Sequence, residues 1–295
     1  MDYFLQLMVS GLSLGAVYAL TAIGYSMVYG VLELINFAHG TVFMVGAYLY
    51  YILSVFIPGL PWYLAFILAI ALTGLIGIVY EKLTVRPLRE AEMPKFAGLI
   101  CLIGVSTVLQ QIVFLFMGST TKQYPLFYNS KVYYLGNITV NRTQLLILGT
   151  TVVVLLFLLF FVNRTKIGMG MRAVAQEANA AEMMGISVNG IISLTFFIGS
   201  ALACLSGVLS CMNFRGVDIS IGNSIAIKAF TATVLGGIGN LWGAAIGAFI
   251  ISYAEVMTAG YITSNLRDFS AYAILIVILL IKPDGLFSKK VQKKV

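Results

Sequence analysis

The sequence carries very little charge. Only 10% of its 295 residues are Asp, Glu, Lys or Arg, whereas soluble domains contain about 25%. Hydrophobic residues make up 60% of the chain, and the mean hydropathy is +0.98. This composition excludes a soluble globular protein. It predicts an all-α, polytopic integral membrane bundle, because a helix satisfies its own backbone polar groups inside lipid.

Residue types that common metal and nucleotide sites require are also scarce. The chain has one histidine, His39, so the two-histidine zinc motif HExxH is impossible. Its cysteines, Cys101, Cys204 and Cys211, lie in apolar stretches and form no CxxC pair. No GxxxxGK[ST] sequence is present, so the chain has no P-loop for ATP. We therefore expect no metal site, no catalytic residue and no cofactor bound by this chain.

One short motif offers a catalytic alternative. Gly11-Leu-Ser13-Leu-Gly15 matches the GxSxG pattern of serine hydrolases. It lies inside a long apolar run and lacks the strand-turn-helix context of a nucleophile elbow. An intramembrane hydrolase with Ser13 as its nucleophile is therefore an alternative. It would require that Ser13→Ala abolish a hydrolase activity.

Charge-free runs divide the chain into membrane spans, each of which needs about 20 residues. The run over residues 34–80 is 47 residues long, so it must turn inside itself, and Pro58, Gly59 and Pro61 supply the turn. We predict a single transmembrane domain over 1–295, with about eight to nine spans. The predicted spans are 5–30, 36–57, 62–80, 96–117, 144–162, 191–211, an interrupted segment 225–257, and 269–282.

The distribution of basic residues predicts the orientation. Segments 81–95, 163–190 and 282–295 hold 12 of the 18 Lys and Arg residues, which leaves six elsewhere. The positive-inside rule makes these three segments cytoplasmic, with the N-terminus outside and the C-terminus inside. Segment 225–257 must then enter the membrane and return. Because the excess of basic residues is explained by membrane orientation, we expect no nucleic acid partner. The first apolar run is too long for the hydrophobic region of a cleaved signal peptide, so we expect this span to stay in the protein.

The interrupted segment contains a glycine-rich break, Gly236-Gly237-Ile-Gly239. Such a sequence does not hold a helix within the membrane unless a neighbouring surface satisfies the freed backbone groups. We predict that the break lines a cavity or packs against another helix. The alternative is a tight hairpin without contact to a solute.

A second irregular stretch, around Glu33, Asn36, His39 and Gly40, joins the first two spans. Burial of polar groups at membrane depth costs free energy, so their presence suggests a function. The alternative is a turn at the membrane interface, in which Asn36 caps the second helix and His39 is in water. Paired interrupted segments are typical of transport pathways. The predicted pathway residues are Asn36, His39, Gly40, Gly236, Gly237 and Gly239.

Small residues recur every fourth position in two of the predicted spans. This spacing predicts close contact between helices, because small side chains let backbones approach. The positions are Gly239, Gly243 and Gly247 in one span, and Gly199, Ala203, Gly207 and Cys211 in the other.

The loop 163–190 differs from the rest of the chain, because it is rich in Ala, Glu and Met. We predict one helix from Arg172 to Gly185 along the cytoplasmic face. Its apolar flank is typical of a helix that docks into a groove on another protein. The alternative is an amphipathic helix that lies on the lipid surface. Such helices are rich in Lys and Arg, whereas this one contains a single basic residue. The predicted docking residues are Arg172, Glu177, Ala180, Ala181, Glu182 and Gly185.

Three stretches together resemble a known family. Ile35–Gly40 followed by Gly46-Ala-Tyr48, the run Lys228–Gly239, and Arg172–Gly185 resemble the LivH-type permease subunit of branched-chain amino acid ABC importers. The resemblance extends nearly from end to end, and it is shared with related permeases for urea and short amides. The chain departs from the commoner pattern at Leu241-Trp242, where relatives often have proline.

This resemblance implies a permease domain in the inner membrane that translocates amino acids. It implies a second homologous permease subunit, two ATPase subunits that bind ATP, and an extracytoplasmic solute-binding protein. The helix Arg172–Gly185 then corresponds to the coupling helix that docks on an ATPase subunit, and the two irregular stretches line the pathway.

Two alternatives to this function are open. One is a urea or short-amide permease of the same family. The other is a self-sufficient channel or secondary transporter, but only Glu33, Lys228 and Glu255 are ionisable near membrane depth, which is few for ion coupling. The roles of Glu33 and Glu255 are open at this point.

Overall fold

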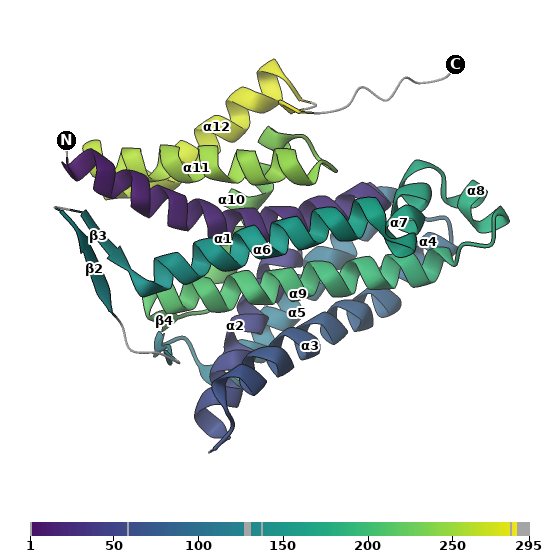
Figure 1. Cartoon of the computed structure of the whole chain (residues 1–295). Coiled ribbons are helices and arrows are strands. Elements are labelled where there is room, and N and C mark those ends of the chain that lie inside the picture. Colours follow the sequence, from purple (N-terminus) through teal and green to yellow (C-terminus); the bar gives the residue numbers. More distant parts are fainter. Residues whose placement is uncertain (1, 58, 127–130, 137, 284, 288–295) are drawn as a thin grey trace.

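The computed structural model describes residues 2–57, 59–126, 131–136, 138–283 and 285–287, and it is a bundle of long helices (Figure 1). The helices are α1 Asp2–Leu32, α2 His39–Phe56, α3 Trp62–Tyr80, α4 Arg86–Glu90, α5 Lys95–Met117, α6 Arg142–Arg164, α7 Lys166–Gln176, α8 Ala178–Met183, α9 Val188–Phe214, α10 Ile221–Gly236, α11 Leu241–Tyr261 and α12 Arg267–Ile281. A π-helical turn, Glu81–Val85, joins α3 to α4, and a 3-10 turn, Ser264–Leu266, precedes α12.

The predicted fold class is confirmed. Eight helical segments of the described chain are long and apolar enough to cross a membrane, and α10 is a shorter apolar helix of 16 residues. The interrupted segment is α10 followed by α11, broken at 237–240. Gly239 in the break lies beside Gly30 near the end of α1, whereas Gly260 near the end of α11 lies beside Tyr3 and Leu7 at the start of α1, so α11 returns toward the end of the bundle where α1 begins.

Short strands, which the sequence analysis did not foresee, lie at that same end. Strands β2 (Val132–Leu135) and β3 (Ile138–Asn141) form an antiparallel hairpin, and β1 (Lys122–Gln123) pairs with β4 (Gly216–Val217). The Gln6 side chain of α1 binds the backbone of Thr139 through both its amide nitrogen and its oxygen. The connections on this side are therefore attached to the start of α1.

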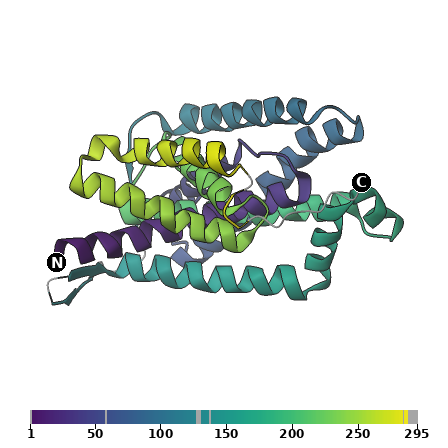
Figure 2. The same cartoon turned by 90° about the horizontal axis from the view of Figure 1, so that it is seen from above.

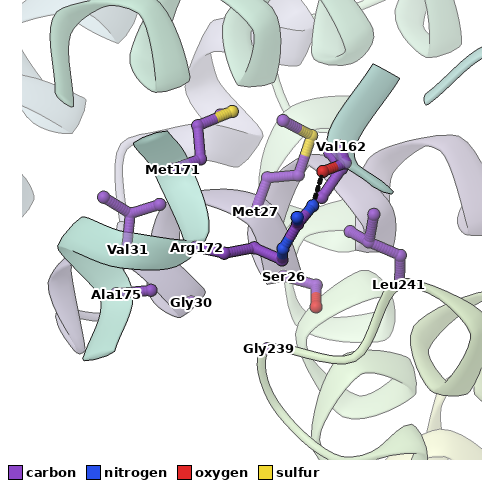
Figure 3. A pocket seen from close by; sticks show the side chains of 10 residues that line it. All are labelled: Ser26, Met27, Gly30, Val31, Val162, Met171, Arg172, Ala175, Gly239 and Leu241. Carbon is purple, nitrogen blue, oxygen red and sulfur yellow. Dashed lines mark hydrogen bonds between the residues drawn. The ribbon is translucent and has the colours of Figure 1, made fainter. Parts of the chain in front are cut away.

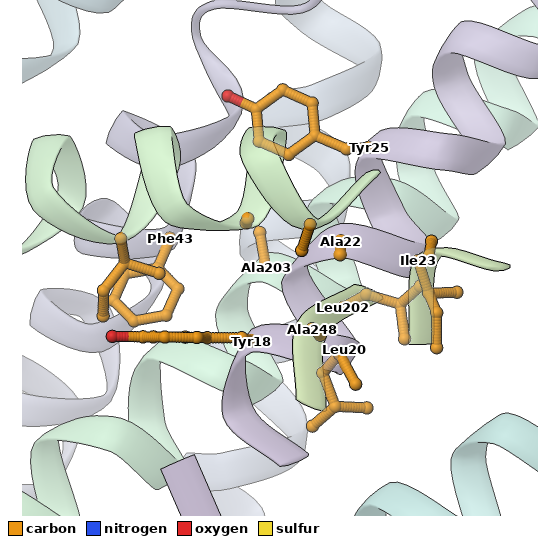
Figure 4. Close-up of a cluster of buried hydrophobic side chains, with 14 of the residues drawn as sticks. Tyr18, Leu20, Ala22, Ile23, Tyr25, Phe43, Leu202, Ala203 and Ala248 are labelled. Carbon is orange, nitrogen blue, oxygen red and sulfur yellow. The ribbon is translucent and has the colours of Figure 1, made fainter. Parts of the chain in front are cut away.

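Helices α1 and α9 form the core. α1 packs against α6, α9, α10 and α11, and α9 packs against α2 and α3. Figure 4 shows side chains of α1, α2, α9 and α11 in this core, and Tyr18, Tyr25 and Phe43 are the aromatic residues that it labels. Viewed from above, α5 and α6 lie along opposite edges of the bundle (Figure 2). α5 and α12 are exposed along most of their length.

Glycines allow the central helices to approach backbone to backbone. A Cβ atom added to Gly243 of α11 would lie 2.1 Å from the carbonyl oxygen of Gly236 in α10. One added to Gly247 would lie 2.1 Å from the carbonyl oxygen of Ala232. The predicted packing role of the four-residue spacing is confirmed for these two glycines, because no larger side chain fits without moving a helix.

We therefore expect Gly243→Val to destabilise the protein by roughly 1–3 kcal/mol through overpacking. The measurement is thermal unfolding of the purified chain in detergent. The matched control is Gly149→Val in α6, where an added Cβ meets nothing within 4 Å. Both glycines are helical, so equal loss of stability in the two variants would contradict the packing explanation.

Candidate functional site

The loop predicted to hold one helix from Arg172 to Gly185 contains two helices, so that prediction is wrong. The chain is extended at Glu177, with φ −160° and ψ 106°, and this residue separates α7 from α8. Met171 and Val174 of α7 and Ala181 of α8 are all buried against the protein. The extended backbone at Glu177 interrupts a segment whose composition favours a continuous helix, so local helix propensity does not decide its structure.

The short helix α8 presents apolar side chains to the outside. Met183 and Met184 are 82% and 83% exposed, and Ala180 is exposed whereas Ala181 is buried. Gly185 ends this segment with φ +81°, a conformation that favours glycine. Figure 1 shows α8 projecting from one end of the bundle. Two exposed methionines on a projecting helix are typical of an adaptable protein-binding surface.

Helix α7 borders a small cavity of about 90 Å³ that it shares with α1 and with the turn between α10 and α11 (Figure 3). Gly30 and Gly239 line it beside Arg172. The Arg172 guanidinium donates a hydrogen bond to the carbonyl of Val162, near the C-terminal end of α6. A cation at this end of a helix is favourable, because the last carbonyls lack partners within the helix. Arg172 thus attaches α7 to α6.

The glycine break lies at the same end of the bundle as α7 (Figures 1 and 3). Gly237 and Gly239 have φ of +95° and +87°, which side chains rarely adopt. The Asn240 side chain accepts a hydrogen bond from the Gly243 amide and so caps α11. The prediction that the break lines a cavity or packs against a helix is confirmed on both counts. Its contact with a solute stays a prediction.

The second irregular stretch is held inside the bundle. The Asn36 amide donates to the Tyr80 hydroxyl over 2.9 Å, and its oxygen accepts from the Ala38 amide. His39 is fully buried, with its Nε2 atom 3.2 Å from the carbonyl oxygen of Thr21. The alternative that His39 is in water is therefore wrong. A Cβ on Gly40 would lie 2.5 Å from the Gly222 carbonyl oxygen of α10. The pathway role of Asn36, His39 and Gly40 stays a prediction.

A cluster of charges joins α1, α10, α11 and α12. Glu255 of α11 is fully buried, and its carboxylate accepts hydrogen bonds from Tyr18 over 2.8 Å and from Lys228 over 2.7 Å. The Arg267 guanidinium also donates to it. Lys228 contacts a second carboxylate, Asp268, at 2.8 Å. Two cations and two carboxylates therefore balance, which makes a buried charge tolerable.

A further buried carboxylate connects α3 with α9. Glu81 is fully buried in the π-helical turn, and it accepts a hydrogen bond from the Ser193 hydroxyl over 2.6 Å. Arg86 lies 3.4 Å from the Glu81 carboxylate and donates to Ser193 over 2.8 Å. Ser193 is in the first turns of α9, which directly follows the α7–α8 segment. The hydrogen bonds of Ser193 thus tie the start of α9 to the π-helical turn that follows α3.

Comparison with known proteins decides the family. The family model described as "Branched-chain amino acid transport system / permease component" matches residues 7–279. The chain belongs to this permease family. It is 36% identical to the high-affinity branched-chain amino acid transport system permease proteins BraD of Pseudomonas aeruginosa and LivH of Escherichia coli K12, over 99% of this chain and 98% of each relative.

More distant comparisons agree with this assignment. The probable LivH of Methanocaldococcus jannaschii is 29% identical over 90% of the permease and 87% of that protein. Among solved structures, a chain of PsaBC from Streptococcus pneumoniae in complex with Fab has a TM-score of 0.51 and 16% identity. It covers 96% of the permease and 93% of that chain. This last likeness shows a shared fold.

The site residues of the permease divide into those that the sequence indicated and those that it did not. Lys228 and Glu255 stood out as ionisable groups, but their pairing with Tyr18, Arg267 and Asp268 depends on helix contacts.

The Ser13 hydroxyl is buried and has no hydrogen-bond partner in the described part of the chain. No base contacts Ser13 there, so the geometry does not support the hydrolase alternative.

We expect Glu255→Gln to destabilise the permease strongly, by about 3–5 kcal/mol, because it leaves two buried or half-buried cations with one carboxylate. The measurement is thermal unfolding in detergent. Asp268→Asn is the matched control, since the Asp268 side chain is 54% exposed, and it should cost much less. Equal losses would mean that burial of the Glu255 carboxylate does not determine its contribution.

Proposed function

We propose that this chain is the permease subunit of an ATP-binding-cassette importer that translocates branched-chain amino acids. The observation that carries the proposal is the 36% identity to BraD and LivH over 99% of the chain. Those relatives are named as high-affinity branched-chain amino acid permeases. Since the sequence contains no P-loop, ATP hydrolysis belongs to other subunits.

The proposed partners are a second homologous permease subunit, two ATPase subunits and an extracytoplasmic solute-binding protein. The exposed α8 supports the ATPase contact, because Met183 and Met184 have no packing role within the described chain. In this proposal Ala180, Met183 and Met184 contact the ATPase subunit, whereas buried Ala181 holds α8 to the permease. Arg172 positions α7 through its bond to Val162.

For the pathway, we propose that Asn36, His39 and Gly40 shape the cytoplasmic half and that Gly236, Gly237 and Gly239 adjoin its inner end. Support comes from the proximity of Gly239 to α7 across the cavity of Figure 3. A turn next to the coupling segment is suited to respond to the ATPase cycle. Glycines there leave backbone groups open to a zwitterionic solute.

The proposed orientation has the start of α1 outside and α8 in the cytoplasm. The loops that hold α4, α7 and α8 lie at one end of the bundle, and the start of α1 lies at the other (Figure 1). The basic segments 81–95 and 163–190 belong to the α8 end. Residues 288–295, which contribute to the basic count, lie outside the described residues.

An impermeant thiol reagent tests this orientation in intact cells, in a chain whose native cysteines are replaced. We expect labelling of Asp2→Cys and protection of Met93→Cys, which is exposed at the opposite end. Labelling of Met93→Cys alone would reverse the topology.

Uptake of labelled leucine by cells with and without this subunit tests the substrate. We expect uptake that requires the ATPase partners, competition by isoleucine and valine, and no competition by urea or acetamide. Competition by urea alone would favour the amide-permease alternative. Uptake in proteoliposomes that contain this chain alone would favour a self-sufficient transporter.

The coupling assignment is tested by a bulky residue on α8. Ala180→Trp should release the ATPase subunits or reduce uptake at least tenfold, while the permease stays folded in the membrane, since Ala180 is exposed. Ala181→Trp should instead lower stability, because Ala181 is buried. Normal uptake by Ala180→Trp would contradict docking through α8.

A further inference from the structure

Helix α5 is attached to the rest of the chain along one side only. On that side Leu102 is fully buried, and the Ser106 hydroxyl lies 2.6 Å from the Thr41 hydroxyl of α2. An apolar cavity between α2, α3 and α5 lies on the same side and is lined by Leu109 and Val113 of α5. With 3.6 residues per turn, the opposite side of α5 carries Ile100, Gly104, Thr107 and Gln111.

This outer face of α5, defined as Ile100, Gly104, Thr107 and Gln111, is partly polar. Gln111 is exposed on this face. It lies six residues before the end of α5 at Met117, or about 9 Å inside that end at 1.5 Å per residue. A carboxamide at this depth is costly to leave in hydrocarbon, so lipid is a poor neighbour for the outer face.

The other two members make the outer face accessible. An atom added at Gly104 meets nothing within 4 Å. The Thr107 hydroxyl donates to the Ile103 carbonyl over 3.0 Å and is already satisfied. The neighbouring Ile100 and Val108 are 55% and 58% exposed. The face thus combines an exposed glycine, apolar side chains and one amide able to donate and accept hydrogen bonds.

Helix α12 provides the internal comparison. It is as little buried as α5. Apart from Asp268 in its first turn, which pairs with Lys228, its strongly exposed side chains are apolar and include Phe269, Ile276 and Leu280, as expected for contact with lipid. Exposure alone therefore does not explain why α5 presents Gln111 and Thr107.

We propose that the outer face of α5 lines the aqueous solute path and contacts the amino acid in transit. This inference rests on the proposed function, and the second permease subunit forms the opposing wall. The Gln111 carboxamide meets the ammonium or carboxylate of the zwitterion, while Ile100 and Val108 contact its apolar side chain. Gly104 leaves room for the solute.

Cysteine accessibility in the assembled, membrane-embedded importer tests the face directly. In a chain lacking native cysteines, we introduce Gly104→Cys, Thr107→Cys or Gln111→Cys and measure reaction with a charged methanethiosulfonate. The control is Ile276→Cys on α12. We expect the three α5 thiols to react at least tenfold faster than the control, and leucine with its binding protein to slow their reaction. Rates no faster than that of Ile276→Cys would overturn the inference and leave a dry protein contact.

Transport kinetics then test the contact with solute. Gln111→Leu should raise the KM for leucine uptake or reduce uptake at least fivefold without loss of assembly. Gln110→Leu, one position around the helix, is the matched control and should transport normally. Identical kinetics for Gln111→Leu and the parent would exclude the contact. If the assembled native importer takes up no leucine, the proposed function fails, whereas the thiol reaction rates still decide the face.

Discussion

The scarcity of water in the hydrocarbon core governs this structure, because a charged group buried there is tolerated only with partners supplied by the protein. Glu255 meets this constraint with Tyr18, Lys228 and Arg267, and Glu81 meets it with Ser193 and Arg86. Each cluster joins helices that are far apart in the sequence. Burial of these charged groups costs free energy, and pairing offsets that cost. The pairs therefore help to specify which helices are neighbours.

Close packing supplies the second part of the design. The α10–α11 hairpin needs Gly236 and Gly243 to be without side chains, since an added Cβ on either would lie within 2.1 Å of the backbone of the other helix. In lipid there is little hydrophobic force to bring helices together, so such contacts contribute much of the association. The same glycines that look like a break in the sequence are in this respect a packing surface.

The end of the bundle that carries α7 and α8 concentrates the elements that we propose to link the ATPase subunits to the solute pathway. Arg172 ties α7 to α6, the turn at Gly239 lies across a small cavity from α7, and Ser193 ties the start of α9 to the π-helical turn. α7 therefore lies beside α1 and the α10–α11 turn, and the start of α9 is tied to the turn that follows α3. This arrangement gives a mechanical basis for coupling in the proposed importer.

The sequence by itself determined the membrane class, the position of nearly every span, and the break between α10 and α11, because hydropathy and glycine content are local properties. It also indicated the family through the runs around His39 and Lys228. Only the tertiary structure decided that the segment Arg172–Gly185 bends at Glu177, that His39 is sealed against Thr21, and that Glu255 has three partners. It alone decided that Gln111 faces away from the chain. Each of these depends on which helix lies beside which, and that choice is made by packing and by pairing of buried polar groups across the whole chain.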